Sequence, residues 1–327
     1  MSVGAPVHAL DTGVPVSFDF AGFNLVGSLH ETNRPAAHGV ILLNQGPVDR
    51  GGSHRLYIKL ANELTAMGVP VLRFDARGVG ESDGIWQAET QETGLSILEA
   101  YGHIQRGVWK DDALAAIEFM QRTTGVSRII LGGLCGGATT AVFAGVDHPA
   151  VDAMFLIGTP ITFSSVTRRT ADLPDAIIER DSAAYRRKLF KLSSWSRLLS
   201  MKTDYRTMAH VFMVQLQRQV GRLGGDASMP GDDDGNINLP LIKSILRACK
   251  RRKRLLFVYG ENDYLWQEFQ EHLKRFGSDR SRLPFELKTI PKANHILTEA
   301  SWQQALFTSV CDWYSRIAGS QAHRQPA

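Results

Sequence analysis

Two patterns of hydrophobic and polar positions occupy the first 160 residues. Apolar and polar residues alternate in Val16–Phe20 and Phe23–Leu29, and Ala21-Gly22 separates the two segments, which predicts an antiparallel hairpin. The later apolar runs are continuous, as is typical of parallel strands buried on both faces; they span 39–44, 69–75, 128–132 and 153–157. Helices are predicted between them, over 54–67, 109–123 and 138–146. This order predicts an α/β fold, with a mostly parallel twisted sheet, an antiparallel edge and helices on both faces.

The strand pattern stops after residue 160 and resumes at residue 255. The segment between contains two basic stretches that look helical, 181–200 and 205–222, and an acidic, turn-rich stretch, 224–236. After it come predicted strands at 255–259 and 285–290 and predicted helices at 266–276 and 301–317. We therefore expect a core formed by 1–160 and 255–318, a helical insertion at 161–254, and a flexible tail at 319–327.

Length and charge support one core with an insertion. The chain has 327 residues, which α/β architectures often use for a single embellished domain. The insertion has 19 Lys and Arg against 9 Asp and Glu, a net charge of +10, whereas the remainder carries −6. One interpretation of this basic segment is an ordinary solvated helix face. The other is attraction of an anionic partner, either a carrier protein with a phosphopantetheine arm or coenzyme A. No nucleic-acid-binding motif accompanies the charge.

Several other classes of protein are disfavoured. The first 20 residues lack a basic start followed by an apolar run, and no apolar stretch reaches the roughly 18 residues of a membrane helix, so we expect a cytoplasmic protein. Three cysteines, Cys135, Cys249 and Cys311, argue against a disulfide framework and lack metal-ligand spacing. The carboxylates at 232–234 lack the alternating spacing of a calcium loop. We expect no metal and no cofactor.

The segment Gly133-Leu134-Cys135-Gly136-Gly137 follows the predicted strand 128–132 directly and precedes a predicted helix. This is the Gly-x-nucleophile-x-Gly pattern of a nucleophile elbow, with cysteine in the position usual for serine. Small neighbours at 133 and 137 allow the tight turn, and the N-terminus of the helix favours a thiolate. The alternative is a small buried cysteine in a glycine-rich turn.

A carboxylate and an imidazole follow in the chain order that a triad on this elbow requires. Asp263 follows the predicted strand 255–259, and His295 follows the predicted strand 285–290. Because the carboxyl ends of parallel strands share one edge of the sheet, Cys135, Asp263 and His295 are predicted to meet there. His295 would exchange the proton and Asp263 would orient the imidazole. Asp263 is also a candidate helix N-cap, and Glu261 competes for the role of the acid.

The chain resembles the α/β-hydrolase superfamily over about residues 15–318. Its arrangement is similar to the serine-aminopeptidase-like branch with a helical lid, and Asp75-Ala76-Arg77-Gly78-Val79-Gly80-Glu81-Ser82 matches a loop that is chiefly structural in that superfamily. The stretch 44–55, Asn-Gln-Gly-Pro-Val-Asp-Arg-Gly-Gly-Ser-His-Arg, together with the cysteine elbow, is similar to hydrolases associated with bacterial exosortase systems. Cysteine elbows also occur in polyester synthases, dienelactone hydrolases and some thioesterases, so cysteine does not select one branch.

The resemblance implies an oxyanion hole with two donors. The backbone N–H of Gly136 would supply one. The loop after the strand 39–44 would supply the other, but Pro47 has no N–H to donate. Two alternatives remain, the backbone N–H of Val48 and the side-chain amide of Gln45.

The resemblance also places the insertion over the rim of the active site. Its apolar residues, including Trp195 and Leu199, would line the pocket for a small-molecule acyl substrate. Two functions follow from these observations. The first is an acyl-transfer enzyme, a thioesterase, ester hydrolase or acyltransferase, that forms an acyl-enzyme on Cys135. The second is a non-catalytic protein of the same fold that binds a ligand.

Overall fold

A computed structural model describes residues 10–33, 36–84, 97–163, 237–273 and 284–322 of the chain. The strands are β1 Val14–Phe20, β2 Phe23–His30, β3 His38–Leu43, β4 Val71–Phe74, β5 Arg128–Leu134, β6 Val151–Ile157, β7 Arg254–Gly260 and β8 Glu286–Ile290. The α-helices in the described ranges are α1 Leu56–Ala66, α2 Ile97–Gln105, α3 Lys110–Thr124, α4 Gly136–Gly145, α8 Leu239–Lys250, α9 Tyr264–Glu271 and α10 Ala300–Ala322.

The strands form one sheet of eight in the order β1-β2-β4-β3-β5-β6-β7-β8. β2 pairs antiparallel with β1 and with β4, and every other neighbouring pair is parallel. The predicted α/β fold with an antiparallel edge is confirmed. From β3 the chain crosses to β4 on one side and then to β5 on the other, so the strand order reverses at β3. The carboxyl ends of β3 and β5 therefore flank a crevice of the kind in which open α/β sheets bind their ligands.

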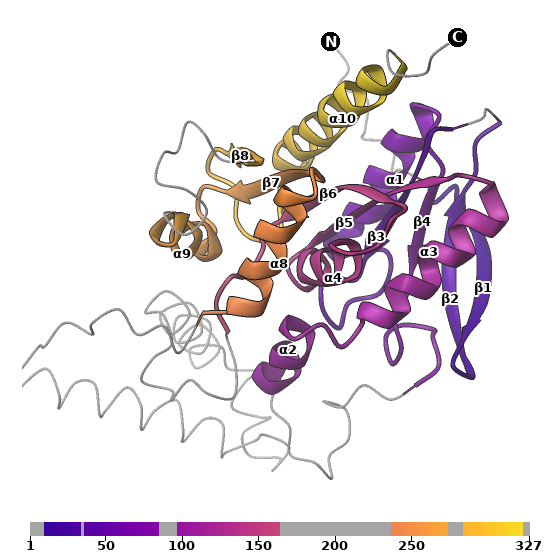
Figure 1. Cartoon of the computed structure of the whole chain (residues 1–327), viewed down its shortest axis with the longest axis horizontal. Helices are drawn as coiled ribbons and strands as arrows, with labels where there is room; N and C mark the ends of the chain where they lie inside the picture. Colours follow the sequence, from indigo (N-terminus) through magenta and orange to yellow (C-terminus); the bar gives the residue numbers. More distant parts are fainter. Residues whose placement is uncertain (1–9, 34–35, 85–96, 164–236, 274–283, 323–327) are drawn as a thin grey trace, which may run out of the picture. The chain divides into compact units, whose positions relative to one another are not determined.

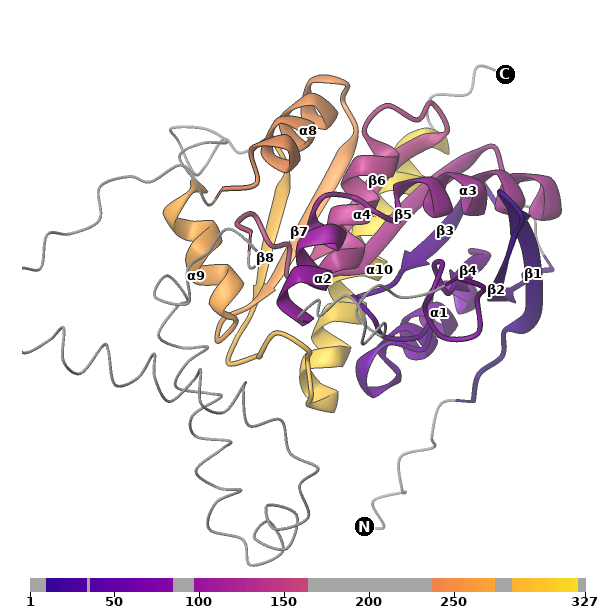
Figure 2. The ribbon, with the colours of Figure 1, turned by 90° about the horizontal axis from the view of Figure 1, so that it is seen from below.

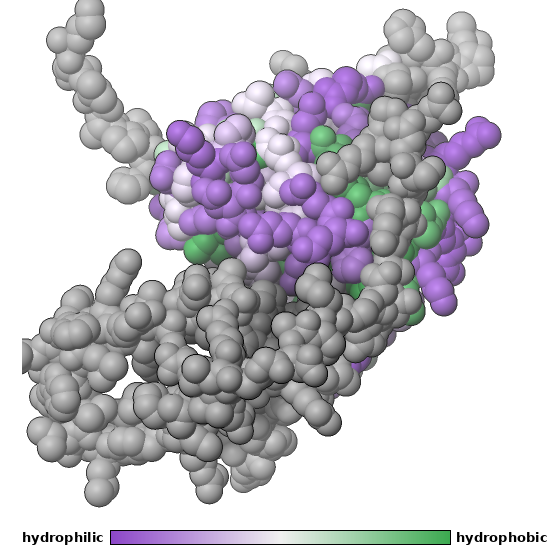
Figure 3. Space-filling view, turned by 90° about the vertical axis from the view of Figure 1, so that its left-hand side faces the viewer, coloured by the Kyte–Doolittle hydropathy of each residue, from purple (hydrophilic) through white to green (hydrophobic). Residues whose placement is uncertain are grey.

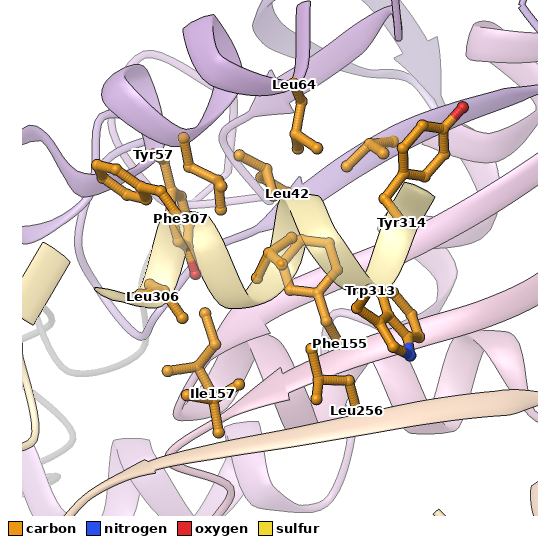
Figure 4. Close-up of a cluster of buried hydrophobic side chains, with 14 of the residues drawn as sticks. Leu42, Tyr57, Leu64, Phe155, Ile157, Leu256, Leu306, Phe307, Trp313 and Tyr314 are labelled. Carbon is orange, nitrogen blue, oxygen red and sulfur yellow. The ribbon is translucent and has the colours of Figure 1, made fainter. Parts of the chain in front are cut away.

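Helices cover both faces of the sheet (Figures 1 and 2). One face packs against α1 and α10, and its buried side chains form a continuous cluster (Figure 4). Large side chains such as Phe155 and Trp313 lie at its centre, with ring centroids 6.3 Å apart and nearly perpendicular planes. The opposite face contacts α3, α4 and α8. This burial on both faces explains why the central strands are continuous apolar runs.

Two helices were not predicted from the sequence. α2 precedes α3, and α8 lies inside the segment expected to be the insertion, 161–254. Asn238 caps the start of α8, and its side chain accepts from the N–H of Leu241 at 3.1 Å and donates to the carbonyl of Gln105 at 2.7 Å. The chain divides into two compact units, Met1–Thr162 with Asn238–Ala327, and Phe163–Ile237. The structural boundary near residue 237 thus differs from the expected boundary at 254, because α8 packs on α4 and β7.

The end of the chain also differs from the expectation. α10 continues to Ala322, so at least the first residues of the expected flexible tail, 319–327, are helical. The two predicted insertion helices, 181–200 and 205–222, lie outside the described residues. No helix in the described ranges is both long and apolar enough to cross a bilayer.

Candidate active site

Cys135 lies between the end of β5 and the start of α4, with a left-handed φ of 56° and a ψ of −114°. Its N–H donates to the carbonyl of Ile157 at 2.8 Å, and the side chain remains partly exposed. The flanking glycines are required, since a Cβ on Gly133 would lie 2.6 Å from the backbone of Gly137, and one on Gly137 would lie 2.3 Å from the carbonyl oxygen of Leu43. The structure thus shows the sharp strand-to-helix turn that the sequence pattern predicted, with a strained backbone at the cysteine.

His295 and Asp263 come together at the same edge of the sheet. The distance between His295 Nδ1 and Asp263 Oδ2 is 2.8 Å. The carboxylate is 1% exposed and the imidazole is 20% exposed, so the pair has one open side. The other carboxylate oxygen of Asp263 accepts from the N–H of Leu265 at 3.0 Å at the start of α9. The two interpretations of Asp263 are therefore compatible, since one oxygen caps the helix and the other contacts the imidazole.

Glu261 does not contact His295 through any described hydrogen bond. Its carboxylate accepts from the backbone N–H of Lys292 at 2.9 Å, and its side chain is exposed. Of the two carboxylates considered from the sequence, Asp263 is the one that the structure places beside the imidazole.

The surroundings of His295 change its protonation. Burial alone lowers the pKa of the imidazole, but hydrogen bonds and charges from Asp263 and Cys135 outweigh it and raise the pKa to about 10. The Cys135 side chain is thus close enough to the imidazole to affect its pKa. The three predicted residues form one connected group, and the resting imidazole holds its proton at neutral pH.

Gly158 provides the space for the imidazole, a role that was not predicted from the sequence. It follows β6 directly with a φ of 50°, and its N–H donates to the carbonyl of Val258 at 2.8 Å. A Cβ at this position would lie 2.9 Å from His295 Cε1 and 3.2 Å from Asp263 Oδ2. A glycine immediately after a buried parallel strand was the available signal, because that strand end lies at the same edge as the elbow.

The predicted oxyanion loop, residues 44–53, is closed against the elbow. The N–H of Gly136 donates to the carbonyl oxygen of Gln45 at 3.0 Å, and the N–H of Val48 donates to the carbonyl oxygen of Gly46 at 2.8 Å. The two backbone donors predicted for an oxyanion hole are thus both engaged within the loop and elbow. The third candidate, the Gln45 amide nitrogen, is buried and has no hydrogen-bond partner among the residues that the structure describes. It lies near Gly52 and the Tyr57 ring, while Gln45 Oε1 accepts from Ser53 at 2.9 Å.

Helix α2 packs over this loop. A Cβ on Gly136 would lie 2.6 Å from Ile104 Cγ2, and a Cβ on Gly46 would lie 3.0 Å from the Tyr101 ring. A side chain at Gly136 would therefore displace Ile104, and one at Gly46 would press on the Tyr101 ring. Because α2 was not predicted from the sequence, its packing over the loop was not predicted either.

Buried charges hold the other end of the loop. Asp75, at the end of β4, is fully buried, accepts from the N–H of Arg50 at 2.6 Å and forms an ion pair with its guanidinium. Asn44 accepts from the N–H of Ala76 at 2.9 Å and donates to the carbonyl of Val48 at 2.9 Å. Asp75 therefore has the structural role that the resemblance implied, and this network anchors the oxyanion loop to β4.

Trp195 and Leu199, the residues expected to line an acyl pocket, lie outside the described residues. Within the described ranges, no three His, Cys, Asp or Glu side chains are grouped so that they could hold a metal ion. The described residues on the face shown in Figure 3 are mainly hydrophilic, with hydrophobic residues in limited areas.

Comparison with known proteins adds the family. A search of curated proteins found no match. Among solved structures, an α/β-hydrolase from Penicillium sp. sh18 is similar with 15% identity and a TM-score of 0.57, covering 94% of this chain and 99% of that one. An esterase from Pyrococcus furiosus is similar with 17% identity and a TM-score of 0.55, covering 94% and 91%. A ferulic-acid-bound structure of Est1E from Butyrivibrio proteoclasticus is similar with 16% identity and a TM-score of 0.51, covering 92% and 98%.

These likenesses at low identity show the fold. The family described as alpha/beta hydrolase fold matches residues 39–296, which include the elbow, Asp263 and His295. The chain therefore belongs to the α/β-hydrolase fold family.

Proposed function

We propose that the protein is an acyl-transfer enzyme that forms an acyl-enzyme on Cys135. Membership of the α/β-hydrolase family supports hydrolase activity in general. The observation that carries the finer proposal is the contact of His295 with Asp263 at 2.8 Å, beside a Cys135 side chain close enough to raise the pKa of the imidazole. A cysteine on a strained elbow, an imidazole beside it and a buried carboxylate behind it form the arrangement that nucleophilic acyl transfer needs.

The reaction would proceed in two steps. His295 holds the proton that the Cys135 thiol releases, and the sulfur attacks the acyl carbonyl, so that a C–S bond forms as the bond to the leaving group breaks. The imidazolium returns its proton to the leaving group. His295 then takes a proton from the acceptor, which attacks the thioester and releases Cys135. Asp263 holds the imidazole in place and stabilises its cation throughout.

The raised pKa of His295 is compatible with both steps. Two of its causes, a hydrogen bond and a charge, come from Cys135. Acylation converts the sulfur into an uncharged thioester and removes both, so the pKa of His295 falls in the acyl-enzyme. A lower pKa increases the share of unprotonated imidazole at neutral pH, and only this form can take a proton from the acceptor, which is the task of the second step.

We favour a thioester or ester as the acyl donor, since a thiolate exchanges readily with thioesters. The acceptor is water in a hydrolase and another nucleophile in an acyltransferase. The insertion, with Trp195 and Leu199 on its apolar side, would line the acyl pocket. Its basic side chains would attract a donor carried by a carrier protein or coenzyme A.

One observation favours the second candidate, a non-catalytic ligand-binding protein. The N–H groups of Gly136 and Val48 both donate to carbonyl oxygens of the protein, so neither is free to donate to the carbonyl oxygen of a substrate. A binding protein has no need of these donors, whereas an enzyme must free them during the reaction.

Intact-protein mass spectrometry after incubation with a series of acyl thioesters separates the two candidates. We expect an added acyl mass that disappears in Cys135→Ala and persists in Cys249→Ala and Cys311→Ala. Cys135→Ala should also remove turnover, and Cys135→Ser should reduce it strongly if the site is adapted to a thiolate. Full turnover by the Cys135→Ala enzyme would rule out the acyl-enzyme mechanism.

A further inference from the structure

The hydroxyl of Tyr57 lies between the two strands that carry the oxyanion loop and the elbow. Tyr57 belongs to α1, is fully buried, and its ring forms part of the core cluster under the sheet (Figure 4). The hydroxyl donates to the carbonyl oxygen of Leu43 at 2.9 Å and accepts from the N–H of Leu134 at 2.7 Å. One oxygen atom therefore joins the end of β3 to the end of β5.

This bridge lies where the two strands separate. β3 and β5 pair in parallel as far as Leu43 and Gly133. Beyond this pair, β3 leads into the oxyanion loop at Asn44, and β5 leads through Leu134 into the elbow. A water molecule or a backbone group would otherwise have to satisfy the buried carbonyl and N–H, because buried backbone groups are almost always hydrogen-bonded.

We propose that Tyr57 is a positioning residue that sets the separation between the two halves of the oxyanion hole. The proposal rests on the acyl-transfer function argued above. Leu43 precedes Gln45 by two residues, and Leu134 precedes Gly136 by two residues. A hydroxyl that fixes Leu43 relative to Leu134 therefore fixes the points from which the chain leads to Gln45 and to Gly136. This holds even while the Gln45 peptide itself moves.

The tolerance for such positioning is small. Donors in an oxyanion hole act at about 2.7 to 3.1 Å from the developing oxyanion, and a displacement of about 1 Å can reduce the rate by about 100-fold. The rigid ring of Tyr57, packed among the side chains of the core cluster, holds its hydroxyl more firmly than a bound water would be held. The charge of Cys135 also contributes to the raised pKa of Tyr57, after burial as the main cause, which is consistent with a short distance between the two groups.

A purely structural role for the same hydroxyl makes a different prediction. Removal of the oxygen would then loosen the elbow as a whole, and every reaction of Cys135 would slow in parallel. Alkylation by iodoacetamide separates the two roles, because it uses the thiolate but forms no oxyanion. Acylation by a thioester uses both.

The experiment compares Tyr57→Phe with wild type in the full-length protein, and Tyr314→Phe is the matched control. Tyr314 belongs to the same core cluster but lies on the opposite side of it in Figure 4. Its ring is edge-on to that of His38, with the ring centroids 5.9 Å apart. We expect Tyr57→Phe to lower kcat for an acyl thioester by about 10- to 100-fold, to leave KM within about threefold, and to leave the alkylation rate within about threefold. Tyr314→Phe should leave all three quantities near their wild-type values.

Unchanged kcat in Tyr57→Phe, or an equal loss of kcat and alkylation rate, would overturn the proposal. If Tyr57→Phe fails to fold, 4-aminophenylalanine at position 57 provides a second variant, since its amine donates to Leu43 but accepts poorly from Leu134. The same divergence of turnover from alkylation is expected there, and its absence would likewise overturn the proposal. Cys135→Ala is measured in parallel. Turnover by Cys135→Ala would refute the acyl-enzyme mechanism, whereas an inactive Cys135→Ala beside a fully active Tyr57→Phe would refute only the role of Tyr57.

Discussion

The backbone N–H of Gly136 donates to the carbonyl oxygen of Gln45 at 3.0 Å, so the structure holds a carbonyl where an acyl-transfer enzyme would hold the oxygen of its substrate. An oxyanion and a carbonyl oxygen are both acceptors and compete for the same N–H. Rotation of the Gln45-Gly46 peptide would move the carbonyl away and free Gly136. Gly46 has no side chain to hinder that rotation, although the Tyr101 ring lies close to it.

The first prediction concerns this closed hole. An aldehyde analogue of the acyl donor adds to Cys135 and gives a tetrahedral adduct at the elbow. The oxygen of this adduct should displace the Gln45 carbonyl from Gly136. A crystal structure of the adduct should show the Gly136 N to Gln45 O distance lengthened beyond 3.5 Å, the limit for a hydrogen bond. An adduct that retains the 3.0 Å contact would show that Gly136 is not a donor in the reaction.

The second prediction separates the two carboxylates near His295. Asp263→Asn should lower kcat by about 10⁴ because the amide no longer fixes the tautomer and charge of the imidazole. His295→Ala should also reduce the chemical step by several orders of magnitude. Glu261→Gln is the control, since Glu261 accepts from the N–H of Lys292 and is exposed. A larger loss in Glu261→Gln than in Asp263→Asn, measured by single-turnover kinetics, would reverse the assignment.

The strands and the three candidate catalytic residues could be predicted because their signals are local. Continuous apolar runs mark buried parallel strands, and residues that follow such runs lie at one edge of the sheet. Asp263 follows a run of this kind, His295 follows the more polar strand 285–290, and Cys135 also has glycine neighbours that indicate its turn. Residues close together in the sequence were therefore sufficient to predict these strands and the three candidate residues.

The closed hole and the Tyr57 bridge have no comparable local signal. The direction of the Gln45 carbonyl depends on the elbow, which lies some ninety residues away in the sequence. Tyr57 follows an apolar periodicity like that of its neighbours on α1, and only the packed structure shows its hydroxyl between two strands. For α8, the abundant basic residues indicate the insertion, whereas Asn238 as N-cap with Pro240 in the first turn is the local signal for a helix start.

The third prediction concerns stability against pH. The pKa of His295 is raised from 6.5 to about 10 in the folded state, so between these values the folded protein binds a proton that the unfolded chain has released. The resulting stabilisation is complete below pH 6.5 and is lost as the pH rises through about 10. The free energy of unfolding should fall across this window with a limiting slope of about 1.4 kcal/mol per pH unit.

Urea denaturation of wild type and of His295→Gln between pH 6.5 and 9.5 measures this contribution. The variant cannot titrate at this position, so the difference in unfolding free energy between the two proteins should shrink as the pH rises. Burial raises the pKa of Cys249 and of Cys311 to about 11, but both proteins contain these two thiols, so their contribution cancels from the difference. A difference that stays constant with pH would contradict a raised pKa for His295.

The fourth prediction concerns the basic insertion. Residues 161–254 carry a net charge of +10 on a protein whose remaining residues carry −6. If this asymmetry attracts an anionic acyl donor, kcat/KM for a donor bound to a carrier protein or to coenzyme A should fall steeply with added salt. Exposed charges are screened over about 8 Å at physiological ionic strength. A short neutral acyl ester, which has no charge to attract, should show little dependence.

Charge reversal tests the same attraction without salt. Arg186→Glu, Arg187→Glu and Lys188→Glu together should lower kcat/KM for the anionic donor while leaving kcat unchanged, because electrostatic steering acts before the chemical step. The neutral ester is the matched control substrate, since its turnover depends on the same Cys135 and His295 but not on the charge of the insertion. Equal salt sensitivity for the two substrates, or an unchanged kcat/KM in the triple variant, would identify the basic segment as an ordinary solvated surface. Such a result would leave the acyl-enzyme mechanism intact, because nucleophile and base belong to the core, and would remove the argument for a carrier-bound or coenzyme-A-bound donor.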